Sequence, residues 1–433
     1  MIINNALIYT EDKGFLPGSI AIENGRFGNI VYTGDKSSGA QMQAGAGASP
    51  AGRAFSTTGA GIDADGCYAI PGLIDVHLHG CVGYNFYDAT FDELCAMFGY
   101  LASNGVTSLS PTTLTLPEDI LTQACLSIAA AARKIDITPA LDNPAAAAAA
   151  GDPKDTSAFE TGGANSYFNL AAPVGIYLEG PFLSPLKSGA QNPAYATLPD
   201  VAMLNRLRQA SGDLVKIIAV APEIDGALDF IEAVAGEIVV AIAHTGADYD
   251  TTVAAFKRGA KHVTHLYNAM SAFNHRDPNV VGAVFDNPEV TAELVGDGVH
   301  LHPAAVRVAI RLLGTERLII VSDSMAAAGL GEGVYDLGGL SVRVSGKEAR
   351  LVGAGNIAGS ASNLMDCLRV AVKEVGMRLE DAVRCASLNP ARLLDISGER
   401  GQILEGMIAD LVLLDTDLNI KEVFVRGYPL MKK

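Results

Sequence analysis

The chain has 433 residues, of which 49% are hydrophobic, and its formal net charge at pH 7 is −17. This charge argues against a protein that binds nucleic acid or an anionic membrane surface. No uncharged apolar run approaches the roughly 20 residues of a membrane span, and the first residues lack the basic and apolar regions of a secretory signal. We therefore expect a cytoplasmic enzyme with either two or three ordinary domains, or one barrel with a small domain attached.

Both ends of the chain carry short β-rich segments. They lie within residues 1–35 and 403–433, and the dipeptides Asn24-Gly25 and Arg426-Gly427 are typical of tight turns between strands. We predict that the two ends build one small β-sandwich domain from residues 1–67 and 399–433. Residues 36–61 and 141–166 are rich in Gly, Ala and Ser or contain an alanine run broken by Gly, Pro and Asp, so they are predicted to be surface insertions.

Between these ends, short β-branched runs alternate with helical stretches. This pattern is typical of repeated βα units and predicts an α/β fold, a TIM-like (β/α)8 barrel over residues 68–398. The eight predicted strands are residues 72–77, 106–110, 174–179, 216–221, 238–244, 262–265, 290–295 and 317–323.

Polar side chains collect at the carboxyl ends of five of these runs, where a barrel of this type carries its chemistry. They are His77, His79, Glu179, His244, His265 and Asp323. His77 and His79 are two residues apart, so in a strand they point to one face, and neutral imidazole is a favoured metal ligand. Simpler explanations stay open: a satisfied histidine pair, a buried Glu179 paired with a cation, and Asp323 as the N-cap of a helix over residues 325–328.

Several motifs together resemble the amidohydrolase superfamily and, within it, the N-acetylglucosamine-6-phosphate deacetylase family. They are residues 71–80, 178–182, 243–247, 264–270, 297–300 and 322–323, and the resemblance extends over nearly the whole chain. It implies the amidohydrolase type of barrel. It also implies release of acetate and glucosamine 6-phosphate from N-acetylglucosamine 6-phosphate, in amino-sugar catabolism.

The resemblance assigns roles to residues at matching positions. Glu179, His244 and His265 would bind a principal divalent metal, Zn or Fe, and intact His77 and His79 allow a second ion with Glu179 as a bridge. Asp323 would be the catalytic acid/base, and His300 would hydrogen-bond the substrate carbonyl. The positions implied to bind substrate are Ala190, Gln191, Asn268, Ala269, Arg276, His300, Ile357, Ala358 and Gly359.

Two features of this assignment concern the phosphorylated sugar. Arg276 can grip a phosphate with two charge-assisted hydrogen bonds, although it can also be a solvated loop cation. Family members are usually oligomers in which this arginine reaches the partner's site, so a homodimer or homotetramer is expected. Gln191 stands where family members often have histidine, and glutamine carries no positive charge.

The alternatives at this stage are enzymes with related chemistry and a protein without catalysis. An N-acetylgalactosamine-6-phosphate deacetylase would differ only in loop contacts to one hydroxyl. An N-acyl-D-amino acid deacylase would share the metal ligands but would not need Arg276. A non-catalytic scaffold of the same fold would have lost metal ligands, whereas Glu179, His244, His265 and Asp323 are all present.

Overall fold

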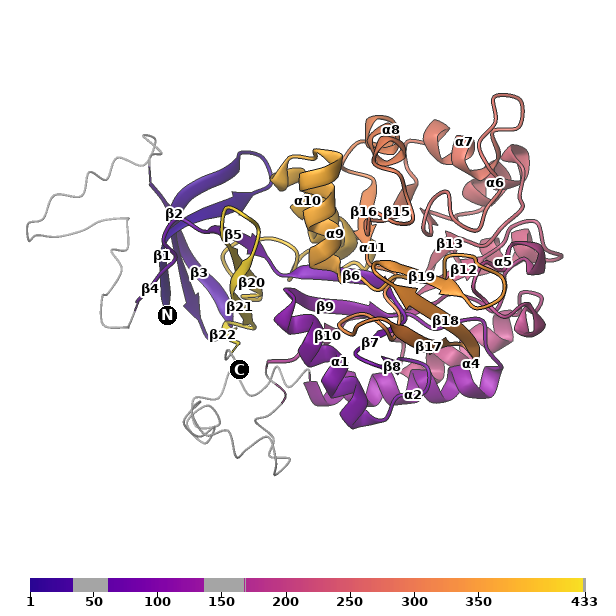
Figure 1. The fold of residues 1–433 in the computed structure, drawn as a ribbon, viewed down its shortest axis with the longest axis horizontal. Helices are drawn as coiled ribbons and strands as arrows, with labels where there is room; N and C mark the ends of the chain where they lie inside the picture. Colours follow the sequence, from indigo (N-terminus) through magenta and orange to yellow (C-terminus); the bar gives the residue numbers. More distant parts are fainter. Residues whose placement is uncertain (34–60, 136–166, 168, 431–433) are drawn as a thin grey trace, which may run out of the picture.

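The structure is a computed structural model that describes residues 1–33, 61–135, 167 and 169–430. A sheet made from both chain ends lies beside a larger α/β body (Figure 1). The two predicted insertions, residues 36–61 and 141–166, lie outside the described residues except for Gly61.

The terminal sheet confirms that both ends of the chain build one small β domain. Its strand order is β22-β21-β20-β5-β1-β2-β3, with β4 also paired to β1. The strands are β1 (Ile2–Thr10), β2 (Gly14–Glu23), β3 (Arg26–Tyr32), β4 (Gly61–Asp63), β5 (Tyr68–Pro71), β20 (Leu411–Leu414), β21 (Ile420–Val425) and β22 (Tyr428–Pro429).

The two predicted turns also form. Asn24 and Gly25 have φ of 51° and 74°, and Arg426 and Gly427 have φ of 49° and 80°, as a two-residue hairpin turn with two positive φ values requires. Ala409 donates a backbone hydrogen bond to Gly25 and accepts one from Gly427. The two hairpin turns, one from each end of the chain, therefore meet at one residue.

Nine parallel strands form the larger body and agree with the predicted barrel, because each of the eight predicted runs overlaps one of them, and only the two-residue strand β10 was not predicted. Two parallel sheets, β10-β9-β6 and β11-β12-β13-β14-β15-β16, are joined by bridges from Leu78 to Ser324 and from Thr112 to Tyr177. The strands are β6 (Leu73–Leu78), β9 (Val106–Pro111), β10 (Ala172–Pro173), β11 (Ile176–Leu178), β12 (Val215–Val220), β13 (Val239–Ile242), β14 (His262–Val263), β15 (Thr291–Val295) and β16 (Leu318–Val321).

Helices cover the outside of these strands (Figure 1). Thr90 shows how one of them starts: its side chain accepts from the backbone of Glu93, which reaches back to the backbone of Thr90 in a capping box. The α-helices are α1 (Phe91–Ser103), α2 (Glu118–Ile135), α4 (Val201–Ser211), α5 (Ala227–Val234), α6 (Tyr249–Lys257), α7 (Asn279–Asp286), α8 (Pro303–Leu313), α9 (Leu364–Val370), α10 (Leu379–Ala386) and α11 (Leu388–Leu393).

Smaller elements decorate the body. Two short antiparallel sheets contain β7 (Gly80–Cys81) with β8 (Tyr84–Asn85), and β17 (Gly333–Leu337) with β18 (Leu340–Ser345) and β19 (Glu348–Leu351). The remaining turns of helix are η3 (Pro185–Lys187), η4 (Pro193–Tyr195) and the π-helical η5 (Ala371–Val375).

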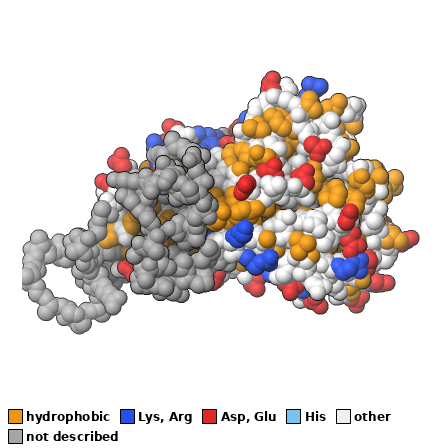
Figure 2. All heavy atoms as spheres, turned by 90° about the horizontal axis from the view of Figure 1, so that it is seen from below, with side chains coloured by type: hydrophobic (Ala, Val, Ile, Leu, Met, Phe, Trp, Pro, Cys, Tyr) orange, Lys and Arg blue, Asp and Glu red, His pale blue; other side chains and the backbone are white. Residues whose placement is uncertain are grey.

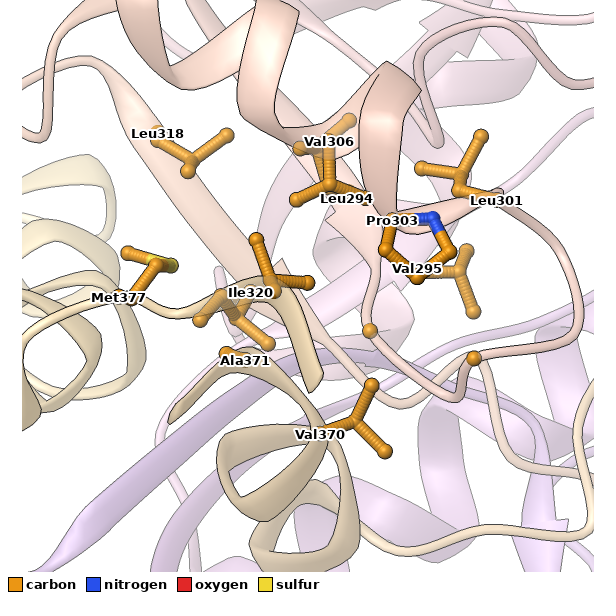
Figure 3. Close-up of a pocket in the computed structure, with 13 residues that line it drawn as sticks. Leu294, Val295, Leu301, Pro303, Val306, Leu318, Ile320, Val370, Ala371 and Met377 are labelled. Atoms are coloured by element: carbon orange, nitrogen blue, oxygen red, sulfur yellow. The ribbon is translucent and has the colours of Figure 1, made fainter. Parts of the chain in front are cut away.

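Both faces of the barrel strands are buried, which is why they read as continuous apolar runs. In β16, Ile319 and Val321 pack inside the barrel, whereas Leu318 and Ile320 point outward. The outward pair helps to line an apolar cavity of about 20 Å³ (Figure 3). This cavity belongs to the packing between the strands and their helices, because Val306 of α8 also lines it.

The surface carries both charged and apolar side chains. On the face drawn in Figure 2, acidic and basic side chains lie in small groups among apolar ones. No helix within the described ranges is long and apolar enough to cross a membrane.

One residue, Gly72, connects the terminal sheet to the barrel. It stands between β5 and β6, and its backbone N donates to the carbonyl of Asp410 just before β20. A Cβ at this position would lie 2.1 Å from Thr107 Oγ1, so the close approach of strand β9 requires glycine. A single residue therefore separates the last strand of the terminal sheet that precedes the barrel, β5, from the first barrel strand, β6.

Candidate metal and catalytic site

The polar side chains that the sequence placed at strand ends meet at one end of the barrel. His77 lies in β6 and His79 directly follows this strand, as Glu179 directly follows β11. His244, His265 and Asp323 come two residues after β13, β14 and β16. His244, His265 and Asp323 have positive φ values of 43°, 28° and 48°. Such conformations are costly for residues other than glycine and collect at functional sites, where the surrounding structure holds them.

The first possible ligand group joins Glu179 to two histidines. Glu179 Oε1 lies 3.1 Å from His244 Nε2 and 2.9 Å from His265 Nε2. All three side chains are buried. Two imidazoles and one carboxylate are a common ligand set for a catalytic divalent ion.

A second group shares the same carboxylate. His79 Nε2 lies 3.3 Å from Glu179 Oε2, and His77 Nε2 lies 3.6 Å from Glu179 Oε1. In each group the ligand atoms lie within 4.8 Å of one another. The described residues therefore offer two overlapping ligand groups with Glu179 in common.

The hydrogen bonds around these histidines fit a metal. The Nδ1 atoms of His77, His79 and His244 face Glu293 Oε2 at 2.7 Å, the Thr112 carbonyl at 3.3 Å and the Lys187 carbonyl at 2.9 Å. Donation from Nδ1 leaves the lone pair on Nε2, where an ion would sit. His77 Nε2 is buried without a hydrogen-bond partner in the described structure. The residues therefore fit a divalent ion bound through Nε2.

The electrostatics of the cluster point the same way. Burial by itself lowers the pKa of His79, but hydrogen bonds to Asp323 and Glu179 raise it to about 9. Burial raises the pKa of Glu179, but the imidazoles of His77 and His244 more than offset this and hold it well below its usual range. Ionised carboxylates that attract protons onto these rings also attract a divalent cation, whose binding displaces the protons.

Asp323 stands between this cluster and His300. Asp323 Oδ1 lies 3.3 Å from His79 Nε2, and Asp323 Oδ2 lies 3.8 Å from His300 Nε2. Residues 326–329 form a turn rather than a helix, so the alternative that Asp323 caps a helix over residues 325–328 is wrong. Its side chain faces the histidines because the backbone after β16 hydrogen-bonds to His77 and takes a left-handed turn.

His300 is oriented by Asp297. His300 Nδ1 lies 2.8 Å from Asp297 Oδ2, and the backbone N of His300 donates to Asp297 Oδ1. Burial lowers the pKa of His300, but its hydrogen bond to Asp297 and the charge of that carboxylate outweigh burial and raise it. A protonated His300 presents an Nε2–H donor toward Asp323 and the space beside it.

Most of the positions matched to substrate binding surround this centre. A Cβ on Gly189 would lie 3.1 Å from His244 Cε1 and 3.3 Å from the Ala269 side chain, so the loop that carries Ala190 approaches both. Asn268 hydrogen-bonds to the His265 carbonyl. Ile357, Ala358 and Gly359 lead into Ser360, whose backbone N donates to the Asp323 carbonyl.

Gln191 and Arg276 lie differently from one another. The Gln191 amide donates to Glu179 Oε2 at 2.5 Å and accepts from the Thr115 backbone at 2.7 Å, so it contacts the shared carboxylate. Arg276 is exposed, and its guanidinium makes no ion pair with any residue that the structure describes. His275 is exposed beside it.

Comparison with known proteins agrees with this geometry. The sequence profile of the Amidohydrolase family matches residues 68–430. The chain belongs to the amidohydrolase family. This amidohydrolase is 34% identical over 359 residues to the N-acetylglucosamine-6-phosphate deacetylase of Bacillus subtilis (strain 168), covering 83% of each chain. It is 32% identical over 358 residues to the N-acetylgalactosamine-6-phosphate deacetylase of Escherichia coli O157:H7, covering 82% of this chain and 86% of that one.

The amidohydrolase also matches a ligand-bound structure. A mutant N-acetyl-D-glucosamine-6-phosphate deacetylase from Mycobacterium smegmatis, in complex with N-acetyl-D-glucosamine-6-phosphate, has a TM-score of 0.79 and 32% identity. The match covers 99% of this chain and 98% of that chain. Fold and sequence therefore agree on one group of relatives.

Sequence reasoning missed the buried side chains beneath the cluster. Glu293 faces His77 from the middle of β15, and His262 faces Glu293. The available signal was a carboxylate in the middle of the mostly apolar run of residues 290–295. An unpaired buried carboxylate is costly, so its presence there implies partners.

Proposed function

We propose that the protein hydrolyses the acetamide of N-acetylglucosamine 6-phosphate to acetate and glucosamine 6-phosphate. The observation that carries this proposal is the position of Asp323, whose carboxylate has one oxygen toward the metal-ligand histidines and the other toward His300. An amide hydrolase needs a proton acceptor for water and a proton donor for the departing amine at one place. The deacetylase relatives support the choice of substrate.

The chain's own residues can perform the proton transfers. A divalent ion, when bound, polarises the acetamide carbonyl and lowers the pKa of water. Asp323 is held ionised, because burial raises its pKa but the hydrogen bond and charges of the neighbouring histidines lower it further. It accepts a proton from the attacking water and returns it to the amine nitrogen. His300, whose protonated form is favoured by Asp297, donates in that form from Nε2 to the carbonyl oxygen as negative charge develops there.

The sugar and its phosphate would lie across the loops around the centre. We assign Ala190, Asn268, Ala269, Ile357, Ala358 and Gly359 to the sugar and its acetamide. The free guanidinium of Arg276 is assigned to the phosphate, since an acidic protein needs a local cation to hold an anion. Gln191 follows Ala190 in the chain and is proposed to contact the substrate there. Its hydrogen bond to Glu179 fits a second role, which is to orient that carboxylate.

The bound metal is proposed to be Zn or Fe, with one ion at Glu179, His244 and His265 and a second at His77, His79 and Glu179. Imidazole and carboxylate ligands suit either metal. Elemental analysis of protein that was never exposed to a chelator checks this, and at least one equivalent per chain is expected, with a second where both groups are filled. Less than half an equivalent of any transition metal in active protein would contradict it.

We propose that the protein forms a homodimer or homotetramer. Two exposed apolar side chains, Leu186 and Phe273, lie on loops at the same end of the barrel as Arg276. Light scattering measures the assembly. A monomer at assay concentration that retains full activity would show that Arg276 serves its own chain.

The deciding experiment is a deacetylation assay on three substrates. N-acetylglucosamine 6-phosphate is expected to give the highest kcat/KM, and unphosphorylated N-acetylglucosamine should be a poor substrate. N-acetylgalactosamine 6-phosphate is the second candidate because an E. coli relative is named for it. A higher kcat/KM on the galactosamine substrate would exchange the two assignments, and no acetate release from either would overturn both.

A further inference from the structure

Glu293 lies under both ligand groups and touches each of them. It is completely buried in the middle of β15. Its Oε2 atom lies 2.7 Å from Nδ1 of His77 and accepts a hydrogen bond of 3.2 Å from the backbone N of His265. One carboxylate oxygen therefore contacts a ring of one group and the backbone of the other.

The other oxygen of Glu293 is held in turn. Glu293 Oε1 lies 2.9 Å from His262 Nε2, and His262 Nδ1 lies 2.7 Å from Thr291 Oγ1. His262 is fully buried, like Glu293. A chain of three hydrogen bonds thus runs from Thr291 through His262 and Glu293 to the His77 ring, and it fixes the carboxylate without an exposed partner.

We propose that Glu293 is a positioning residue that sets the metal affinity of the His77 and His79 group and holds His265 in place. The inference rests on the metal sites of the proposed function. A carboxylate acceptor fixes the His77 tautomer with its proton on Nδ1, so that the lone pair on Nε2 faces the ligand centre. Its negative charge also makes the imidazole a stronger ligand.

The contact with His265 explains why one residue influences both groups. His265 has a φ of 28°, a conformation that a residue other than glycine keeps only when its surroundings hold it. Its backbone N is tied to Glu293, whereas its ring nitrogen Nε2 faces Glu179. A change in Glu293 therefore acts on a ring in one group and only on the backbone in the other, so the two groups should respond unequally.

A pair of substitutions distinguishes the effect of the negative charge of Glu293 from the effect of its side-chain length. Glu293→Gln keeps the shape: its amide oxygen can accept from His77 and His265, and its NH2 group can donate to His262 if that ring moves its proton to Nδ1. Glu293→Asp keeps the charge but shortens the side chain by one methylene. Thr291→Val is the matched control, because it removes the far end of the chain of hydrogen bonds, together with the bond from Thr291 Oγ1 to the Lys261 carbonyl, and leaves Glu293 unchanged.

The measurement is zinc occupancy of the holoenzyme after equilibrium dialysis against a series of buffered Zn²⁺ concentrations. For Glu293→Gln we expect the weaker step of the occupancy curve to shift by about 10- to 100-fold, and the tighter step to shift less. Glu293→Asp should show a shift in the same direction, and Thr291→Val should stay within about threefold of the parent.

Cobalt-substituted protein gives a second readout, since the visible spectrum of the weaker site should change in Glu293→Gln while that of Thr291→Val stays like the parent. Occupancy curves of both Glu293 variants within about threefold of the parent would overturn the proposal. No sugar enters these measurements. They can therefore succeed or fail independently of whether the protein deacetylates N-acetylglucosamine 6-phosphate.

Discussion

Residues other than glycine adopt positive φ both in the terminal sheet and at the end of the barrel, but for different reasons. In the terminal sheet, Asn24 and Arg426 begin two-residue turns in which glycine follows. At the barrel end, His244 and Asp323 have similar φ values without a hairpin to require them. In the first region the conformation reverses the chain, and in the second it aims a polar side chain at a shared centre.

The difference shows where a substitution should be felt. A turn residue contributes to the free energy of unfolding and touches no reacting group. A residue with a strained backbone at the carboxyl end of a barrel strand is kept for its chemistry. It is expected to lower the free energy of unfolding, as functional sites commonly do. Variants in the two regions should therefore separate stability from turnover.

The largest effect is expected for Asp323→Asn at the barrel end. The amide keeps the shape but cannot accept the water proton, so turnover should fall by roughly a thousand-fold. Thermal stability and content of the principal metal should stay close to the parent. Measurement of kcat alongside the melting temperature checks this, and retention of more than about a tenth of the parental turnover would refute the acid/base role.

The sequence was enough to place Asp323 at a strand end beside the histidines, but it did not reveal the side chains beneath them. The eight apolar runs and the histidines at their ends follow from periodicity and from the rule that parallel strands carry chemistry at their carboxyl ends. The sequence does not predict which side chains pair beneath the histidines. Glu293 and His262 lie on neighbouring strands, and their contact depends on the geometry of the barrel. Contacts of Gln191 with Glu179 and Thr115 likewise bring together distant positions of the connection after β11 and the loop after β9.

The second prediction concerns the two ligand groups. Replacing both His77 and His79 with Gln should remove one metal equivalent and leave the ion at Glu179, His244 and His265, because these three do not depend on β6 for their ligand atoms. Metal analysis of the purified double variant gives the result. Loss of all metal would show that the two groups form one cooperative site.

The third prediction tests the exposed cation. Arg276→Ala should weaken binding of the phosphorylated sugar by about 2–3 kcal/mol, since a charge-assisted contact is lost. The effect should appear mainly in KM, because the phosphate is remote from the acetamide and is bound equally in the ground and transition states. Unphosphorylated N-acetylglucosamine serves as the control substrate. Equal losses on both sugars would mean that Arg276 supports the fold or the metal site.

The smallest effect is expected in the terminal sheet. Asn24→Ala should lower the free energy of unfolding by about 1–2 kcal/mol, because alanine is disfavoured at a positive φ where asparagine is tolerated. Asn24→Gly, which accepts this conformation, is the matched control and should remain close to the parent. Thermal unfolding measures both, and kcat should be unchanged. A loss of turnover in Asn24→Ala would show that the two regions are coupled more closely than their separate roles suggest.

The connection at Gly72 gives the terminal sheet a mechanical role. Strand β5 is held by β1 on one side and by β20 on the other, and a single glycine later the chain enters the strand that carries His77. A premature stop codon or a proteolytic cut that removed β20 would leave β5 with one neighbour and would release Gly72 from Asp410. The last strands of the chain thus help to hold strand β6, which carries His77. Loss of these strands should therefore also disturb the proposed metal site.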